Sequence, residues 1–242
     1  MAQSAFTIIV PVFEETEALE FARFYYQRLG LTPIFALDSK RQDRFAEVAK
    51  IVGRPPVIYN NPGHCIEAGY DQLAALSPTD WVLRVDCDEA PNTKMINYCA
   101  RFVARPTDAY CSFDRDDLLW RETTFQRLKY KPLFVDSQFR LFNRRKVKFL
   151  PRIHTPGFDI PKWKVPFLPG WNAPASARLY HLQRTFITAQ QRADKLARYN
   201  DQGQDQIFNT WLTRADDSFK WRSFNDATFT KLFAEWKAHR PL

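Results

Sequence analysis

Glycine is scarce in this sequence, with seven residues among 242, and long apolar runs are absent. So little glycine excludes a collagen-like repeat, and an apolar fraction of 45% with 26% charged residues excludes a disordered chain. The longest apolar run, FTIIVPVF at 6–13, has eight residues, whereas a bilayer-spanning helix needs about 20. No basic segment precedes this run and no small-residue cleavage site follows it, so we expect no signal peptide. The run instead predicts a buried strand.

Paired cysteines are also lacking. Cys65, Cys87, Cys99 and Cys111 form no Cys-x-x-Cys pair and do not have the spacing of a zinc site. Free thiols in a reducing cytoplasm are the simplest account of such a pattern. We therefore expect a cytoplasmic protein, for which contact with a membrane surface stays open.

Positive charge is concentrated in one part of the chain. The net charge is +8, whereas residues 140–200 hold thirteen Lys and Arg against two acids, a local balance of +11. The remaining residues carry −3. This excess favours an anionic partner without deciding the fold. Any single basic residue of the segment is equally compatible with a solvated strand or helix face.

Short apolar segments alternate with helical patterns along the first part of the chain. Strands are predicted at 6–13, 33–37, 57–59 and 81–85, and helices at 18–29, 44–52, 65–76 and from about 93. Such alternation implies an α/β fold with a mainly parallel central sheet flanked by helices. Sheets of this kind bind ligands beyond the carboxyl ends of their strands.

After residue 105 this alternation ends. Strands are predicted at 109–113, 139–143 and 147–153, and helices at 185–199, 203–213 and 226–238. Between the two sets, residues 156–174 hold five prolines and two tryptophans. They predict a long loop, and long loops inside compact domains often carry function.

Three carboxylates follow the predicted strand 81–85 within four residues. Asp86, Asp88 and Glu89 repel one another unless they point into water or a cation holds them. On an extended segment Asp86 and Asp88 lie on the same side. Mg²⁺ or Mn²⁺ binds one or two carboxylates together with phosphate oxygens. A solvated acidic turn that caps the helix near Thr93 accounts for the pattern equally well.

Acidic residues also follow the first two predicted strands, as Glu14 and Glu15 and as Asp38. With the triplet, this arrangement resembles the family-two nucleotide-sugar glycosyltransferases of the GT-A fold. Their motifs are an opening strand that ends Pro-x-Tyr-Asn-Glu, an acid that ends the second strand, and Asp-x-Asp after the fourth. The resemblance covers roughly residues 6–200, and its further matches are Asn61-Pro62-Gly63, Arg140-Leu141-Phe142 through to His154, and His181 with Lys195–Tyr199.

The chain departs from the family pattern at three positions. Glu14 stands where the family has asparagine, and Phe13 where it has tyrosine. An aromatic face still stacks on a nucleobase, worth about 1–3 kcal/mol by analogy with single-stranded nucleic acids. Thr155 stands where an acid often follows the first histidine, so the catalytic base stays open.

The resemblance implies a metal-dependent, inverting glycosyltransferase that moves a sugar from a nucleotide-diphosphate donor to an acceptor hydroxyl. Mn²⁺ or Mg²⁺, held by Asp86, Asp88 and His154, would neutralise the departing diphosphate. The residues expected to bind the nucleotide sugar are Pro11, Phe13, Glu15, Asp38, Gly63, Arg84, Asp86 and Arg140. The candidates for the base that deprotonates the acceptor are Asp136 first, then Asp114, Asp116 and Asp117, which we expect in an acidic turn after 109–113.

Several of these residues have structural alternatives. Phe13 is equally compatible with the core, Asp38 with a helix cap before Lys40, and Glu15 with a cap of the first helix. A lone histidine such as His154 is usually structural. For the domains, the resemblance implies a GT-A domain over 1–182, with its donor half at about 1–113 and its acceptor half at about 114–182, and a helical extension over 183–242.

The acceptor and two other classes of protein stay open. A basic acceptor region suits a DNA base, a lipopolysaccharide core or an envelope glycan. A non-catalytic nucleic-acid-binding protein would use the basic residues of 140–200. A two-metal nuclease or nucleotidyltransferase would use Asp38, Asp86 and Asp88.

Overall fold

The apolar run near the start of the chain forms the central strand of a sheet, β1 (Thr7–Val12), in the computed structural model. All its residues are buried, as a strand covered on both faces requires. β1 pairs in parallel with β2 (Ile34–Asp38) on one side and with β4 (Trp81–Arg84) on the other. β3 (Val57–Tyr59) adds to β2, also in parallel. The four predicted strands of the first part of the chain are confirmed.

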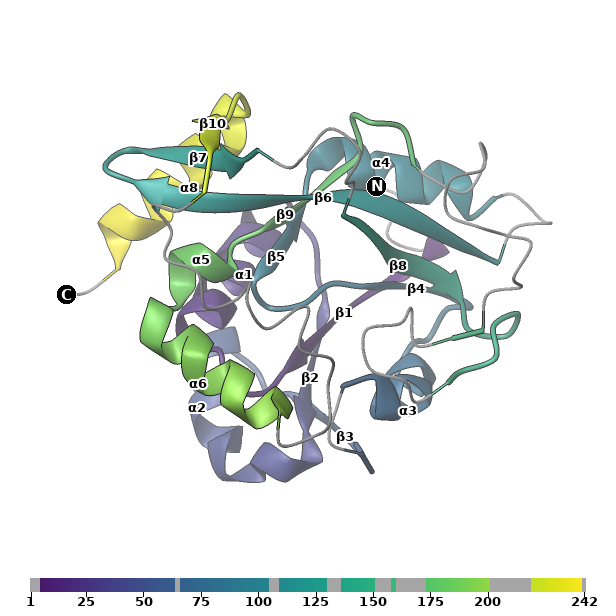
Figure 1. Ribbon diagram of the computed structural model, residues 1–242. Coiled ribbons are helices and arrows are strands. Elements are labelled where there is room, and N and C mark those ends of the chain that lie inside the picture. Colours follow the sequence, from purple (N-terminus) through teal and green to yellow (C-terminus); the bar gives the residue numbers. More distant parts are fainter. Residues whose placement is uncertain are drawn as a thin grey trace. The chain divides into compact units, whose positions relative to one another are not determined.

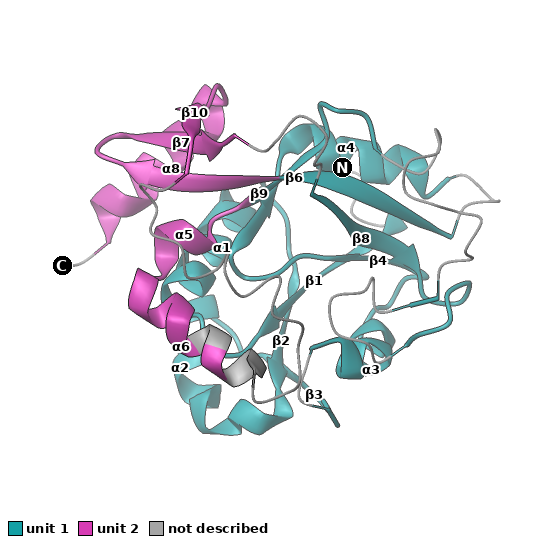
Figure 2. Cartoon of the chain, in the orientation of Figure 1, with its two compact units in different colours: residues 1–115, 136–180 teal, residues 116–135, 181–242 magenta. Residues whose placement is uncertain are grey.

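The structure describes residues 5–63, 66–104, 109–129, 136–150, 158–159, 173–200 and 219–240. His154, most of the predicted loop 156–174 and the predicted helix 203–213 lie outside these ranges. The chain divides into two compact units, coloured separately in Figure 2. Unit 1 comprises residues 1–115 and 136–180, and unit 2 comprises residues 116–135 and 181–242.

Two antiparallel strands extend the parallel part of the unit 1 sheet. β8 (Ser137–Asn143) pairs with β4, and the first half of β6 (Tyr110–Arg121) pairs with β8. The strand order in unit 1 is therefore β6-β8-β4-β1-β2-β3. Its α-helices are α1 (Thr16–Arg28), α2 (Phe45–Val52), α3 (Tyr70–Ala75) and α4 (Thr93–Phe102). The protein has the expected α/β fold, with a mainly parallel sheet flanked by helices.

Helices cover both faces of this sheet, and Figure 1 shows α3 and α4 on either side of β4 and β8. On one face, Tyr70 and Leu73 of α3 pack in a cluster with Ile9 and Val82. On the other face, the ring of Phe102 in α4 contacts that of Trp81, which precedes Val82 in β4. The two rings are edge to face, with centroids 5.7 Å apart. Trp81 and Val82 point to opposite faces because side chains alternate along a strand.

The acids at 114–117 do not form the turn that the sequence predicted. Asp114, Asp116 and Asp117 lie inside β6, which runs on to Arg121 and turns at Glu122-Thr123 into β7 (Thr124–Leu128). Charged residues are tolerated in this strand because each has a partner of its own, described below. The expectation of a turn was therefore wrong.

Two further expectations need correction. No strand runs through residues 147–150, where an isolated bridge joins Phe149 to Phe158. Asp86 to Glu89 is not extended but forms a turn, in which the Glu89 N–H donates to the Asp86 carbonyl oxygen at 2.9 Å. The turn leads into the short strand β5 (Glu89–Pro91), which pairs with β9 (Arg178–His181). Neither short strand has a sequence pattern long enough to predict it.

Unit 2 is built around aromatic side chains. The second half of β6, β7 and β10 (Trp221–Ser223) pair antiparallel. Its helices in the described residues are α5 (Gln183–Phe186), α6 (Ala189–Asn200) and α8 (Ala227–His239). The ring of Phe125 in β7 contacts those of Phe229 and Phe233 in α8, at centroid distances of 5.4 and 4.7 Å. These contacts supply an apolar core for the unit.

The predicted thiols and the missing membrane segment can be compared with the structure. Cys87, Cys99 and Cys111 form no disulfide, as expected, and all three are buried, while Cys65 lies outside the described residues. In the described parts of the chain, no helix combines the length and apolar character that crossing a bilayer requires.

The start of α4 is fixed by Asn92. Its side-chain oxygen accepts the N–H groups of Met95 at 2.8 Å and of Arg178 at 3.2 Å, so it caps the helix and binds β9. Its amide nitrogen donates to the Ser176 carbonyl oxygen at 3.0 Å and to the Tyr180 hydroxyl at 3.3 Å. One buried side chain thus joins α4 to residues 176–180.

Replacing Asn92 by alanine should lower the free energy of unfolding by about 2–4 kcal/mol, because the cap is lost and buried groups lose their partners. Asn92→Ser keeps a capping oxygen and loses the amide donor, so its loss should be roughly half as large. Urea denaturation of both variants measures the difference. Equal losses in the two variants would contradict the contribution assigned to residues 176–180.

Candidate functional site

Polar residues follow three neighbouring parallel strands of unit 1. Glu14 and Glu15 come after β1, Asp38 ends β2, and the acidic turn 86–89 comes after β4. Because β1 lies between β2 and β4 and all three run in parallel, these residues lie at the same edge of the sheet. Such an edge is where open α/β sheets bind ligands.

The end of β1 is joined to both neighbouring strands. The buried Cys87 thiol of the acidic turn donates to the Pro11 carbonyl oxygen at 3.1 Å. Burial raises the pKa of Cys87, so the thiol stays protonated at neutral pH and is no nucleophile. Arg44, which follows β2, donates to the Phe13 carbonyl oxygen at 2.9 Å. The predicted residues Pro11 and Phe13 are thus placed beside the acidic turn and the β2 end.

Phe13 is not a core residue. Its side chain is 37% exposed, and the guanidinium of Arg41 lies 5.4 Å from its ring centroid. Arg41 is held by Glu14, to which it donates at 3.0 Å. Glu15 accepts the backbone N–H of Glu14 at 2.9 Å and that of Phe13 at 3.4 Å. Glu15 therefore shapes the turn that presents the Phe13 ring.

Arg44 organises this edge, and sequence reasoning missed it. Its buried guanidinium donates to Thr16 at 2.6 Å and to both carboxylate oxygens of Glu47 at 2.6 and 2.9 Å. The hydrogen bonds from Arg44 lower the pKa of Glu47 to about 2. In the sequence, an arginine at the start of a helix is indistinguishable from a solvated one.

Asp38 makes the contacts of a helix cap, which was the structural alternative to nucleotide binding. Its buried carboxylate accepts the Lys40 N–H at 2.9 Å, and so caps the 3₁₀ helix that follows β2. The Asn61 amide donates to it at 2.7 Å and the Tyr59 hydroxyl at 3.3 Å. Asp38 thereby fixes the Asn-Pro-Gly turn.

Gly63 in that turn is required by close packing. A Cβ at this position would lie 2.3 Å from the Cβ of Ala68, a distance that carbon atoms not bonded to each other do not adopt. The Gly63 N–H also donates to the Asn61 side chain at 3.3 Å. The glycine therefore holds the 61–63 turn against the 3₁₀ helix Ile66–Gly69.

Arginines stabilise the carboxylates of the acidic turn. Asp86, with its side chain 32% exposed, accepts from Arg84 at 2.7 Å and from Arg140 at 2.9 Å. Glu89 is fully buried and binds the guanidinium of Arg140 through both oxygens, at 2.5 and 2.9 Å. Arg140 thus lies between two of the three acids, which removes the repulsion that the sequence suggested.

The ion pairs continue from the acidic turn to Asp136. Arg115 lies 3.5 Å from Glu89 and donates to Asp136 at 2.7 Å. Gln138 donates to the other oxygen of Asp136 at 2.6 Å. The Asp136 side chain remains 15% exposed. The structure therefore links the first candidate base to the acidic turn within unit 1.

The other candidate bases lie in different surroundings. Asp114 of unit 1 accepts from Ser137 at 2.9 Å and pairs with Arg178 at 3.2 Å. Asp116 and Asp117 belong to unit 2. There Asp116 binds Arg127 through both oxygens, at 3.0 and 3.1 Å, and the buried Asp117 is hydrogen-bonded to Nδ1 of His181.

A divalent metal at this site would need phosphate oxygens for most of its coordination. Both oxygens of Asp86 accept from arginines, whereas Asp88 is partly exposed. Among the described residues, which exclude His154, no group of three or more His, Cys, Asp or Glu side chains is arranged to hold a metal ion. Mg²⁺ and Mn²⁺ bind through one or two carboxylates plus substrate phosphates. The described carboxylates therefore form no metal site made of protein ligands alone, and a bound ion would depend on substrate phosphates.

Part of the basic segment 140–200 lies inside the protein. Arg140, Arg184 and Arg192 are buried. In unit 2 the Arg184 guanidinium lies 4.4 Å from the Phe219 ring centroid, and Arg192 donates to the Ile187 carbonyl oxygen at 2.9 Å. These charges bind within the chain, so the local excess of +11 overstates the charge available to a partner.

No family model and no curated protein matches the chain. Among solved structures, the chain is similar to CMP:2-keto-3-deoxy-manno-octonic acid synthetase complexed with CTP, with a TM-score of 0.37 and 10% identity, covering 58% of this chain and 74% of that one. HddC from Yersinia pseudotuberculosis has a TM-score of 0.39 and 8% identity, covering 73% and 93%. S. aureus TarS 1–349 has a TM-score of 0.39 and 8% identity, covering 86% and 69%. Likeness of this degree is distant, so the function proposed below rests on the site's own residues.

Replacing Glu89 by alanine should lower the free energy of unfolding by about 3–5 kcal/mol, because it takes a buried carboxylate away from Arg140. Asp80→Ala serves as a control, since its pair with Arg145 is exposed on both sides and should be worth about 0–1 kcal/mol. Chemical denaturation of both variants measures the losses. Similar losses would contradict the role assigned to the buried pair.

Proposed function

We propose that this protein is a glycosyltransferase that moves a sugar from a nucleotide-diphosphate donor to an acceptor hydroxyl. The observation that supports it is the acidic turn 86–89, placed beyond the carboxyl end of β4 and joined through Arg140, Glu89 and Arg115 to Asp136. In such a reaction, cations at the edge of the sheet would stabilise the negative charge of the nucleotide diphosphate. A carboxylate nearby would accept the proton of the acceptor hydroxyl.

The donor would occupy the edge formed by β1, β2 and β4. The exposed Phe13 ring offers a face for the nucleobase, and Glu15 and Arg41 hold that face in place. Asp88, which is partly exposed, would hold a divalent ion together with the diphosphate oxygens, and this ion would neutralise the diphosphate as a Lewis acid. Arg84 and Arg140 orient Asp86 rather than the donor, because both are buried and already paired with it.

In the proposed reaction, the acceptor oxygen attacks the anomeric carbon of the sugar. The new carbon–oxygen bond forms as the bond to the diphosphate oxygen breaks, and the nucleoside diphosphate leaves with the electron pair. The acceptor proton passes to a carboxylate, for which Asp136 is our candidate. Arg115 and Gln138 fix the orientation of this carboxylate while part of it stays exposed. Attack opposite the leaving group inverts the anomeric centre.

The geometry of Asp38 disfavours the two-metal alternative. A nuclease or nucleotidyltransferase of that kind would need Asp38 as a ligand beside Asp86 and Asp88. Asp38 is buried and already accepts from Lys40, Asn61 and Tyr59. A hard cation would have to replace these bonds, at the cost of the turn that they hold.

Nucleotide diphosphates and nucleotide sugars should raise the melting temperature of the protein, and by more in the presence of Mn²⁺ than in its absence. A ligand at about 100 times its dissociation constant stabilises the folded state by about 2.7 kcal/mol. Differential scanning fluorimetry measures the shift. If none of these ligands shifts the transition, the proposed function is wrong.

Asp136→Asn should reduce sugar transfer by about 10²–10⁴-fold, because the acceptor proton loses its base. Its affinity for the nucleotide sugar should be unchanged, since the donor edge is formed by other residues. Asp71→Asn, at an exposed position on α3, is the control and should transfer at the normal rate. Release of nucleoside diphosphate gives the rate, and calorimetry gives the affinity. Normal turnover by Asp136→Asn would exclude Asp136 as the base.

A further inference from the structure

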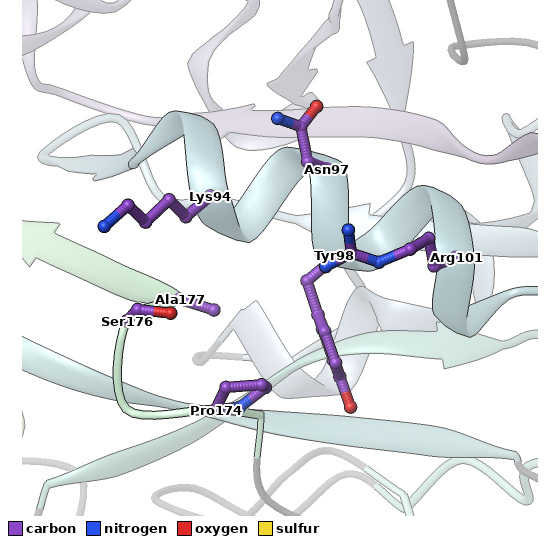
Figure 3. Close-up of a pocket in the computed structure, with 7 residues that line it drawn as sticks. All are labelled: Lys94, Asn97, Tyr98, Arg101, Pro174, Ser176 and Ala177. Carbon is purple, nitrogen blue, oxygen red and sulfur yellow. The ribbon is translucent and has the colours of Figure 1, made fainter.

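A concave site separate from the acidic turn lies in unit 1 between α4 and the turn before β9 (Figure 3). It has a volume of about 230 Å³, several times the ~30 Å³ that one water molecule takes up in the liquid. Its lining includes Lys94, Asn97, Tyr98, Arg101, Pro174 and Ser176. None of these residues belongs to the acidic turn or to the candidate base.

The walls of this pocket are held in fixed positions. Asn92 binds the first turn of α4 and the Ser176 carbonyl oxygen, so both walls meet at one buried side chain. Tyr98 is largely buried, and its ring lies edge to face with that of Phe113 at a centroid distance of 6.2 Å. In Figure 3 the Tyr98 side chain extends from α4 toward the turn that holds Pro174. The pocket is therefore formed in the folded chain before any ligand binds.

The charge of the pocket is positive. Lys94 and Arg101 are seven residues apart on α4, which places them on the same helix face. Among the described residues none of the lining side chains is acidic, and α4 contains neither Asp nor Glu. Arg178, which follows the lining in sequence, forms an ion pair with Asp114, and this pair neutralises the charge of the Asp114 carboxylate. The two cations of the pocket are left to attract an anion from solution.

The lining of the pocket offers side chains of the kinds that bind a phosphate ester. Lysine binds phosphate as a point charge and arginine through a fork of N–H groups. The Ser176 hydroxyl and the Asn97 amide are further polar groups in the lining, while Tyr98 and Pro174 provide apolar surface of the kind found in small-molecule sites. A duplex is gripped by many basic side chains along its backbone. Two cations at one cavity favour a small phosphate ester.

We propose that this pocket binds the phosphoryl group of a phosphorylated saccharide, and that this saccharide is the acceptor. The proposal that the pocket binds a phosphate ester depends on the pocket alone. The proposal that the bound saccharide is the acceptor rests on the proposed function. Lys94 follows Asp88 by six residues, across β5 and the Asn92 cap. The pocket and the acidic turn are therefore anchored to the same short stretch of unit 1.

The test compares Lys94→Gln/Arg101→Gln with Lys50→Gln/Lys237→Gln, which removes the same charge at exposed positions on α2 and α8. Calorimetry in phosphate-free buffer measures binding of glucose 6-phosphate, inorganic phosphate and glucose. The wild type and the control should bind glucose 6-phosphate, more weakly inorganic phosphate, and not glucose. The pocket variant should bind both phosphates about tenfold or more weakly, since each charged hydrogen bond is worth about 1.5–3 kcal/mol.

Equal affinities in the pocket variant and the control would overturn the proposal, as would wild-type protein that binds neither phosphate. Weakened binding of a DNA duplex with unchanged binding of glucose 6-phosphate would overturn it too. Melting shifts with nucleotide sugars, measured on the same proteins, should be unaffected by the pocket substitutions. If they are absent from every protein while the phosphate ester still binds, the proposed function fails and the phosphate site stands. If they are present and the phosphate ester does not bind, the pocket proposal alone fails.

Discussion

The contact of Arg140 with Asp86 and Glu89 is the interaction on which the candidate site depends. Carboxylates crowded into one turn would repel each other, and burying Glu89 alone would be costly. Arg140 binds Glu89 through two hydrogen bonds and Asp86 through a third. It reaches them because β8 pairs with β4, the strand that leads into the turn. The antiparallel addition to the parallel sheet thus permits an acidic turn at its edge.

The same ion pairs connect the two ends of the proposed chemistry. Arg115 contacts Glu89 on one side and Asp136 on the other, so the carboxylate that we propose as the base is positioned by an arginine that also contacts the acidic turn. Removing one member of such a buried pair would leave an uncompensated charge, so the pairs hold these side chains in fixed orientations. A base fixed in this way needs little rearrangement when the acceptor binds.

The positive charge that is available to a ligand differs between the sequence and the folded chain. The sequence suggests a basic surface over 140–200, yet Arg140, Arg184 and Arg192 are buried and bind within the protein. Two cations without an ion-pair partner among the described residues instead lie on α4, outside the basic segment 140–200. A count of charges along a chain does not distinguish those that complete the fold from those that meet a ligand.

The sequence by itself determined the parallel half of the fold and the positions after its strands. β1 and β4 are buried on both faces, so their apolar runs are unmistakable, and the acids beyond β1, β2 and β4 follow in order. Only the tertiary structure decided which charges meet, since Arg140 and Asp86 are 54 residues apart. It also placed Asp114 to Asp117 in a strand, where each finds a partner that no local pattern announces. Strand register and long-range ion pairs decide these features, and neither leaves a periodic trace in the sequence.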